Sequence, residues 1–342
     1  MEIALIKSYT DKPWRSPETY QLIEDSLKEK WPVHSINTKS TGTLYRFLTR
    51  LKQDCGKSIF VFNIAEYLDE KNKTGFLPAL LDEWNKPHLG SSTEAIAIGL
   101  DKARTKALLS EQQIPTPRYF VANRDDSGIN YQADSIGYPL IVKPIREGGH
   151  IGIREDSIVY DDAGLDKIVN RIFDTHHQPA LVEEFITGNG MREFSVGIID
   201  SEIRLFTPIE IDFESMNVEK EILSFEAAQK DLERTKLVQD KTIRDEIIDL
   251  SRRTFSAVGA SDYSRVDLRM NHTGCYVLEI NIMPGLGPLS FLPEAAKDIH
   301  ALEYDQLIQK LAADSMQRQK KGRTRKHHRV MAQGSAVVGH RI

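Results

Sequence analysis

The segment from residue 265 to residue 281 alternates polar and apolar side chains in a pattern that can build a metal site. Its flanks read RVDLRM and CYVLEIN, and the residues NHTG between them favour a turn, so the pattern predicts a β-hairpin. A three-residue loop over 272–274, with Gly274 in the left-handed conformation, pairs Asn271 with Cys275.

In that register Asp267 lies opposite Glu279, and Arg265 lies opposite Asn281. Cross-strand partners share one face of a sheet, so these four polar side chains are predicted to point the same way. The opposite face is apolar and is expected to enter a core; it comprises Val266, Leu268, Leu278 and Ile280.

Two facing carboxylates repel each other, and a cation between them relieves the repulsion. Carboxylate and amide oxygens suit Mg²⁺, which proteins usually bind through one or two carboxylates and the phosphates of a substrate. The alternative is an exposed polar face with a chance pairing of charges. The following loop, Met283–Pro288, favours the metal site, because its glycines allow backbone N–H groups to approach an anion closely.

The composition is that of a water-soluble protein with two or three domains. The chain has 342 residues, of which 40% are hydrophobic, and no apolar stretch approaches the length of a membrane span. The N-terminal apolar run is too short for a signal peptide. Two cysteines, Cys55 and Cys275, suggest neither a disulfide framework nor a metal cluster, so we expect a cytoplasmic protein without a membrane partner.

Charge is concentrated at the C-terminus. Residues 318–342 carry eight Lys or Arg residues and no acidic residue, and we predict a basic, disordered tail there. The other 37 basic and 50 acidic residues give residues 1–317 a net charge of about −13. An acidic body argues against nucleic acid as the main substrate, although the tail could still act as a nucleic-acid tether.

The N-terminal segment has the pattern of a small α/β domain. Apolar runs at Ile3–Ile6 and Ile59–Ile64 are typical of strands, and Thr19–Lys30 and Leu44–Leu51 between them have helical spacing. Strands separated by helices predict a parallel sheet over residues 1–95. No GxGxxG sequence follows the first strand, which weakens a dinucleotide-binding interpretation.

The rest of the chain mixes helices with short strands. The segment Ala95–Gln113 is predicted to be a helix that ends before two prolines. Further expected elements are a strand at Tyr138–Pro144, a glycine-rich loop over 146–152, strands at Leu181–Ile186 and Phe194–Ile199, a polar excursion over 214–235, and helices near 242–258 and 301–317.

With these motifs in this order, the chain resembles the ATP-grasp enzymes and, among them, the D-alanine–D-alanine ligase family. The resemblance covers about 90–295 and includes LGSSTEAIAIGLDKARTKALL, IPTP, GYPLIVKPIREGGHIGI, LVEEFI, REFSVGI, RVDLRM and YVLEINIMPGLGPLSFLP. It implies an α/β fold with a Rossmann-like N-terminal domain followed by a two-lobed ATP-grasp of α+β type. The expected domains are 1–95, a central lobe over 96–182, a C-terminal lobe over 183–317, and the tail over 318–342.

The resemblance also implies roles for single residues at the nucleotide. Asp267, Glu279 and Asn281 match residues that bind two Mg²⁺ ions, or Mn²⁺, bridging the phosphates of ATP. Lys102 and Lys143 match lysines that contact the phosphates, a task suited to point charges on flexible stems. The alternatives without a function are that Lys102 is an ordinary lysine on a helix surface and that Lys143 is an ordinary lysine at the end of a strand.

Two further segments match the nucleotide site of the family. Gly148 and Gly149 lie in the loop that resembles a flexible lid over the phosphates, with an ordinary surface turn as the alternative. Glu193 matches the acid that binds the ribose hydroxyls. The adenine-binding linker, whose backbone groups read the base edge, is matched by Glu183, Glu184, Phe185 and Ile186.

The chemistry that the family performs is the phosphorylation of a carboxylate by ATP, followed by attack of an amine on the acyl phosphate. Arg265 and the backbone N–H of Gly285 match donors to the oxyanion that forms in this attack. Ser290 matches the residue that holds the carboxylate of the second substrate, although a serine there could also cap a helix. The resemblance implies small-molecule carboxylate and amino-acid substrates and suggests a homodimer.

Departures from the family pattern fall at the first substrate. The N-terminal glutamate that holds the ammonium group of the first D-alanine is not apparent, and Gly149 and His150 replace two serines of the lid. Ala228 and Gln229 stand where we align a Lys-Tyr pair. We therefore predict a ligase with a changed carboxylate substrate. The alternatives are a true D-alanine–D-alanine ligase, an amino-acid ligase of specialised metabolism such as mycosporine-like amino acid synthesis, and a non-catalytic nucleotide-binding protein.

Overall fold

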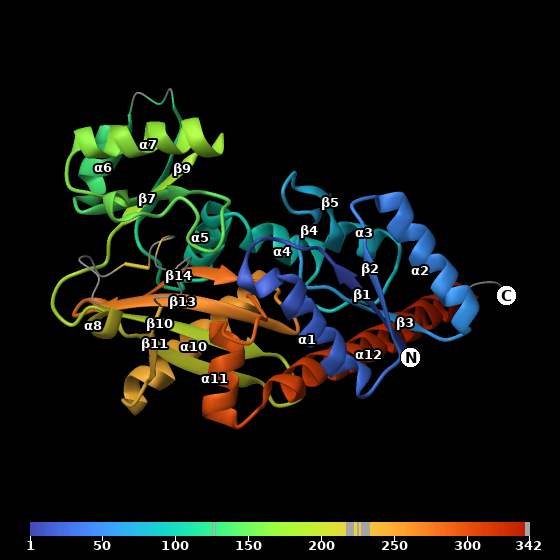
Figure 1. The fold of residues 1–342 in the computed structure, drawn as a ribbon. Helices are drawn as coiled ribbons and strands as arrows, with labels where there is room; N and C mark the ends of the chain where they lie inside the picture. The colour runs from blue at the N-terminus through green and yellow to red at the C-terminus, as the bar shows by residue number, and fades with distance from the viewer. Residues whose placement is uncertain (125, 127, 217–221, 224–225, 227–232, 339–342) are drawn as a thin grey trace. The chain divides into compact units, whose positions relative to one another are not determined.

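The computed structural model describes residues 1–338 except 125, 127, 217–221, 224–225 and 227–232, with side chains described as far as residue 321. The chain divides into two compact units (Figure 1). The first unit comprises Met1–Ser92, Ile199–Leu205 and Gly285–Ile342, and the second comprises Thr93–Ile198 and Phe206–Pro284. Residues from Gly285 onward therefore cluster with the N-terminal segment, whereas the sequence analysis placed 183–317 in one lobe.

The first unit is built on a parallel sheet of three strands in the order β2-β1-β3, which confirms the predicted parallel α/β arrangement. Leucines of two helices cover one face of this sheet and form its core. The strand β2 was not predicted, because its sequence VHSIN is polar and mostly half-exposed. The elements are β1 (Glu2–Lys7), α1 (Pro17–Lys28), β2 (Val33–Asn37), α2 (Thr41–Cys55), β3 (Ile59–Phe62), β4 (Tyr67–Asp69), β5 (Thr74–Phe76) and α3 (Leu77–Glu83).

Two C-terminal helices complete the first unit. The helix α11 (Phe291–His300) was not predicted, and α12 (Tyr304–Val338) continues beyond residue 317, where the sequence analysis ended its last helix. Arg318 donates a hydrogen bond to the carbonyl of Gly90 at 3.1 Å, and Gln319 donates one to the carbonyl of His88 at 3.2 Å. The first residues of the predicted disordered tail are thus helical and bonded to the unit, which corrects its starting point.

The second unit contains two antiparallel sheets. The smaller has the order β6-β9-β7-β8, and α6 and α7 pack on one of its faces (Figure 1). The larger has the order β12-β11-β10-β13-β14 and is contacted by α10. The elements are α4 (Thr93–Gly99), α5 (Lys102–Glu111), β6 (Tyr119–Ala122), α6 (Ile129–Ile136), β7 (Leu140–Pro144), β8 (Ile158–Val159), α7 (Asp162–His176), β9 (Ala180–Glu184), β10 (Arg192–Ile199), β11 (Leu205–Ile211), α8 (Phe213–Met216), β12 (Thr235–Leu237), α10 (Lys241–Val258), β13 (Tyr263–Asn271) and β14 (Gly274–Asn281).

The single helix predicted over Ala95–Gln113 is in fact two helices, α4 and α5. Asp101 stands between them in an extended conformation, and its side chain accepts a hydrogen bond from the backbone N–H of Arg104 at 3.1 Å. Such a cap satisfies an N–H group at the start of α5 and fixes the direction of that helix. The break therefore determines where Lys102, the first residue of α5, lies in the unit.

The hairpin β13–β14 has the predicted register at its metal end and a different one at its turn. Arg265 pairs with Asn281, and Asp267 pairs with Glu279, as predicted. The turn end is shifted by one residue, because Asn271 pairs with Gly274 and the loop has two residues, not three.

An irregularity between Asp267 and Leu268 absorbs this shift, since Leu268 pairs with Val277 and leaves one extra residue in β14. Val277 is consequently fully buried, while Leu278, which was predicted to face the core, is only half-buried. Both residues are apolar, so the hydrophobic pattern alone could not locate the bulge.

No helix in the described part of the chain has both the length and the hydrophobicity that crossing a bilayer requires.

We predict that Gly99→Ala destabilises the protein by about 2 kcal/mol, the usual cost of overpacking a core. A Cβ atom at Gly99 would lie 2.3 Å from Cγ1 of Ile282, which is buried. Gly42→Ala is the matched control, because in the described structure a Cβ there meets only ordinary contacts, the nearest at 3.6 Å. Urea unfolding of both variants tests this, and equal stabilities would contradict it.

Candidate active site

Polar side chains of β10, β13 and β14 converge on Asp267. Arg265 donates two hydrogen bonds to this carboxylate, from Nε at 2.9 Å and from Nη2 at 2.8 Å. Ser195 of β10 donates to Oδ1 at 2.7 Å, and Asn281 donates to Oδ2 at 2.9 Å and to Oε1 of Glu279 at 3.3 Å. The predicted four-residue face is therefore assembled, with Ser195 as a further member.

Glu279 is held in its ionised form by surrounding cations. Burial alone would raise the pKa of this carboxyl group, but Lys102 and Lys143 outweigh burial and hold the pKa well below its ordinary value. Lys102 Nζ lies 3.2 Å from Oε2 of Glu279. The lysine that was predicted to contact phosphates thus points into the site and is not on a helix surface.

A buried ion cluster lies beside this face. Lys143 of β7 binds one carboxylate oxygen of Glu183 on β9, and Lys106 of α5 lies 2.8 Å from the other. Burial lowers the pKa of Lys106 to about 8, because this side chain is fully enclosed, whereas the carboxylate of Glu183 raises the pKa of Lys143 despite its burial. The two lysines together keep the pKa of Glu183 below its usual value, although burial would raise it.

The predicted linker begins inside β9, where Glu183 is paired with both neighbouring strands, and the N–H groups of its next two residues are bonded to other loops. The N–H of Glu184 donates to the carbonyl of Arg118 at 2.8 Å, and that of Phe185 donates to the carbonyl of Pro139 at 3.1 Å. The side chain of Glu184 forms an ion pair with Arg118 at 3.0 Å. Neither N–H can also read a base in this conformation, which limits the predicted role of the linker to Ile186 and to carbonyl groups.

Glu193 on β10 is buried against Arg269 of β13, with 3.6 Å between Oε2 and Nη1. Burial raises the pKa of Glu193 to about 7, and the nearby charge of Asp267 adds to the effect, while Arg269 opposes it. Arg269 in turn lies 4.4 Å above the ring of Phe185. Near neutral pH this carboxyl group can therefore either donate or accept a hydrogen bond, and a ribose hydroxyl can pair with it in either state.

The glycine-rich loop follows β7 directly. Gly149 and His150 both have positive φ angles, 61° and 58°, and a Cβ at Gly152 would lie 2.5 Å from Pro144. The ring of His150 lies 3.5 Å from a carboxylate oxygen of Glu233. The loop thus makes tight turns that glycine permits. The positions of the missing Lys-Tyr pair, Ala228 and Gln229, lie outside the described residues.

Gly285 and Ser290 belong to the first unit, where they lie together. A Cβ at Gly285 would be 2.9 Å from Oγ of Ser290 and 2.8 Å from Cβ of Trp14. Ser290 stands at the N-cap position of α11, but among the described residues its side chain makes no capping hydrogen bond. The capping alternative is therefore not realised, and the substrate-binding role stays a prediction.

The donor set fits a magnesium ion. Asp267 and Glu279 supply carboxylate oxygens on paired positions, and a half-turn of the Asn281 amide would present its oxygen to the same point, giving the hard oxygen ligands that Mg²⁺ prefers. Arg265 and Lys102 compensate the charge of the two carboxylates in this structure.

Another group of potential ligands lies in the first unit, where Glu2, His34 and Cys55 have ligand atoms within 4.8 Å of one another. This group was not predicted from the sequence. Lys57 also pairs with Glu2 at 3.4 Å, and the hydrogen bond to Glu2 raises the pKa of Cys55, so this group favours a protonated thiol over a bound cation.

A family model described as the C-terminus of D-ala D-ala ligases matches residues 108–313. A D-alanine–D-alanine ligase of Pediococcus pentosaceus is 34% identical over 311 residues, which are 89% of this chain and 82% of that protein. This chain belongs to the D-alanine–D-alanine ligase family.

An uncharacterised protein of Sinorhizobium fredii is 32% identical over 231 residues, 66% of each chain. The solved D-alanine–D-alanine ligase of Bacillus anthracis in complex with ATP superposes with a TM-score of 0.74 at 21% identity, covering 94% of this chain and 99% of that one. The predicted ATP-grasp fold of this family is thereby confirmed.

Three site residues escaped the sequence analysis although a periodic signal was present. Arg269 follows Asp267 by two residues, and Ser195 follows Glu193 by two, so each shares the face of its neighbour on a strand. Lys106 follows Lys102 by four, which places both on one face of α5. Lysine is rarely buried unless paired, so nothing in the sequence marked Lys106 as enclosed.

We predict that Lys106→Met lowers the free energy of unfolding by about 3 kcal/mol, as expected when one partner of a buried ion pair is removed. Glu183 would keep only Lys143 as a counter-charge in a site closed to water. Lys241→Met, which breaks an exposed pair with Asp245, is the control and should leave stability unchanged. Urea denaturation distinguishes the two, and a Lys106→Met protein as stable as the wild type would refute the assignment.

The pKa of Glu193 predicts a pH dependence of stability in protein free of metal and nucleotide. The folded value of about 7 lies above the unfolded value of 4.5, so the folded state binds the extra proton between these values. Stability should therefore fall as pH rises from about 4.5 to about 7, by about 3 kcal/mol at most.

Urea titrations at several pH values, compared with Glu193→Gln, measure this contribution. The variant should lose this part of the pH dependence, whereas Glu184→Gln, which alters a half-exposed carboxylate, should retain it. Parallel pH profiles of the wild type and Glu193→Gln would disprove the raised pKa.

Proposed function

We propose that this protein is an ATP-dependent carboxylate–amine ligase that forms an amide bond through an acyl phosphate and releases ADP and phosphate. The observation that carries the proposal is the paired face of Asp267 and Glu279, bordered by Lys102 and Arg265, in a chain of the D-alanine–D-alanine ligase family. A face of this composition can hold divalent cations and offers cations to phosphate oxygens.

Asp267, Glu279 and Asn281 would hold the Mg²⁺ ions, which when bound neutralise charge on the transferring phosphoryl group. Lys102 and Lys143 would contact the phosphates as point charges. Lys143 reaches the site from β7, which precedes the glycine-rich loop. The two-point hydrogen bond to Asp267 holds the guanidinium of Arg265 in one orientation, which suits a group that must meet an oxyanion.

For the nucleotide, we place the base edge at the linker and the ribose at Glu193. With the N–H groups of Glu184 and Phe185 already bonded, Ile186 N–H and the linker carbonyls would read the base. The half-protonated state of Glu193 near neutral pH suits hydroxyl groups, which both donate and accept. Ser290 would hold the carboxylate of an amino acid that serves as the amine.

The first substrate that we propose is a carboxylate other than D-alanine. Gly149 and His150 in the lid, and the absence of an acid at residues 13–16 of the N-terminal turn, depart from what a D-alanine site requires. The second candidate is D-alanine–D-alanine ligation, which the 34% identity with the Pediococcus pentosaceus enzyme favours. The cytoplasm is the compartment that we propose, in keeping with two cysteines that form no disulfide in the described structure.

An ADP-release screen over amino acids and small carboxylates tests the proposal. We expect ATP turnover with at least one carboxylate–amine pair, and we expect Glu279→Ala to reduce it by about 10³-fold or more, because a ligand that neutralises the transition state is lost. Glu202→Ala, which alters an exposed acid, is the control.

The outcomes separate the candidates. Strong phosphate release that saturates with D-alanine alone would establish the second candidate. Tight ATP binding without ADP formation from any pair would instead show a nucleotide-binding protein without ligase activity.

A further inference from the structure

The two carboxylate oxygens of Asp267 face different neighbouring strands. In the larger sheet β13 lies between β10 and β14, so Asp267 has Ser195 of β10 on one side and Glu279 of β14 on the other. Oδ1 accepts the hydrogen bond of Ser195 at 2.7 Å, whereas Oδ2 accepts that of Asn281, from β14, at 2.9 Å. Oδ2 is therefore the oxygen on the side of Glu279.

The side-chain amide of Asn281 bridges the two paired carboxylates. Its nitrogen donates to Oδ2 of Asp267 at 2.9 Å and to Oε1 of Glu279 at 3.3 Å. A donor shared by both carboxylates occupies the place where a shared cation would neutralise them. Because a half-turn of the amide exchanges its nitrogen for its oxygen, Asn281 can release both carboxylates and become a ligand itself.

The hydrogen bonds of Asp267 leave a metal ion one way to bind. Oδ1 accepts from Ser195 and from Nε of Arg265, while Oδ2 accepts from Asn281 and from Nη2 of Arg265. A carboxylate offers about four lone-pair sites, so an ion can bind only where one of these donors leaves. Ser195 lies on the side away from Glu279, and its hydrogen bond can persist while the amide of Asn281 turns.

Ser195 is itself held in a defined place. Its side chain is buried, and its strand is joined to β13 by a second contact on the same face. Glu193, two residues before Ser195, lies 3.6 Å from Arg269, two residues after Asp267. A donor fixed by the sheet in this way gives the carboxylate that it binds one preferred orientation.

We infer that Ser195 is a positioning residue for the metal site: its hydrogen bond to Oδ1 holds the carboxylate of Asp267 so that Oδ2 faces Glu279 and receives the Mg²⁺ ion. The inference rests on the proposed function, which assigns the ion to Asp267, Glu279 and Asn281. It adds to that function a residue that does not touch the ion but raises its affinity. Partners that orient a metal ligand typically contribute about 10- to 100-fold to that affinity.

Binding of Mn²⁺, which replaces Mg²⁺ and is detected by electron paramagnetic resonance, tests the inference. The full-length protein is titrated with MnCl₂, without nucleotide and with saturating ADP, and ADP without protein serves as the blank. We expect Ser195→Ala to raise the Kd for Mn²⁺ by about ten-fold or more, because Asp267 loses the donor that orients it. Ser195→Thr keeps the hydroxyl group and should bind Mn²⁺ as tightly as the wild type.

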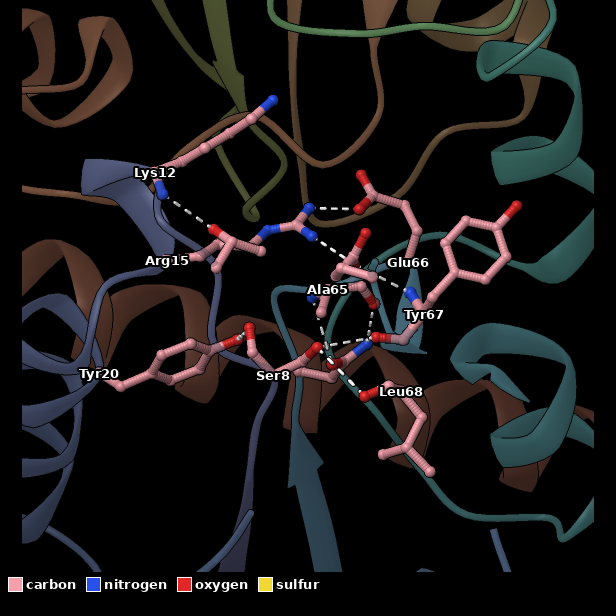
Figure 2. Close-up of polar contacts among 11 residues, drawn as sticks. Ser8, Lys12, Arg15, Tyr20, Ala65, Glu66, Tyr67 and Leu68 are labelled. Carbon is pink, nitrogen blue, oxygen red and sulfur yellow. Dashed lines mark hydrogen bonds and ion pairs between the residues drawn. The ribbon is translucent and has the colours of Figure 1, made fainter. Parts of the chain in front are cut away.

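Ser8→Ala is the matched control. Ser8 is also buried, and its hydroxyl group donates to the carbonyl of Tyr67 at 3.0 Å within the first unit (Figure 2). The control thus removes a buried serine hydrogen bond that does not involve the carboxylates, and it should leave the Kd for Mn²⁺ unchanged. Urea unfolding in EDTA verifies that each variant is folded under the conditions of the titration.

Equal Kd values for the wild type and Ser195→Ala overturn the inference. An equal loss of affinity in Ser195→Thr also overturns it, since the hydroxyl group would then not be the cause, and so does an equal loss in Ser8→Ala. A wild type that binds no Mn²⁺, with or without ADP, would instead defeat the metal site of the proposed function.

Discussion

Two carboxylates held opposite each other across a hairpin place the strongest constraint on this molecule. Asp267 and Glu279 are paired residues of neighbouring strands, and their charges cannot remain so close without compensation. Arg265, from the same face, compensates one of them, and Lys102, from the first turn of α5, compensates the other. The break between α4 and α5 and the cap at Asp101 place Lys102 at the start of α5, where it supplies that second cation.

A second buried carboxylate of this unit, that of Glu183, also needs cations to compensate its charge. Glu183 is enclosed between Lys143 and Lys106, which come from a strand and a helix that are distant in sequence. Lys106 also donates to Thr116 at 2.7 Å, whose hydroxyl group donates to the carbonyl of Val277 on β14 at 2.8 Å. This chain of bonds connects the smaller sheet, through α5, to the strand that carries Glu279. The charges that define the site of the second unit therefore also link several of its elements to one another.

The sequence predicted the elements that repeat a simple pattern. Alternation along β13 and β14 was enough to place four polar side chains on one face, and the order of motifs was enough for the ATP-grasp fold. The bulge was beyond prediction, because Val277 and Leu278 are both apolar and either could face the core. The break after Gly99 was hidden within a run rich in alanine, leucine and lysine. The enclosure of Lys106 depends on where Glu183 arrives in space, which no local pattern encodes.

The extra residue in β14, Leu278, lies between the metal end of the hairpin and its turn, which have different registers. The removal of Leu278 would restore regular pairing, with Leu268 opposite Val277 and Asp267 still opposite Glu279, and an insertion at the two-residue turn would likewise leave the Asp267–Glu279 pair where it is. The turn is thus a point at which length can vary among descendants of this gene, or a reporter group can be introduced, without displacing the acidic pair.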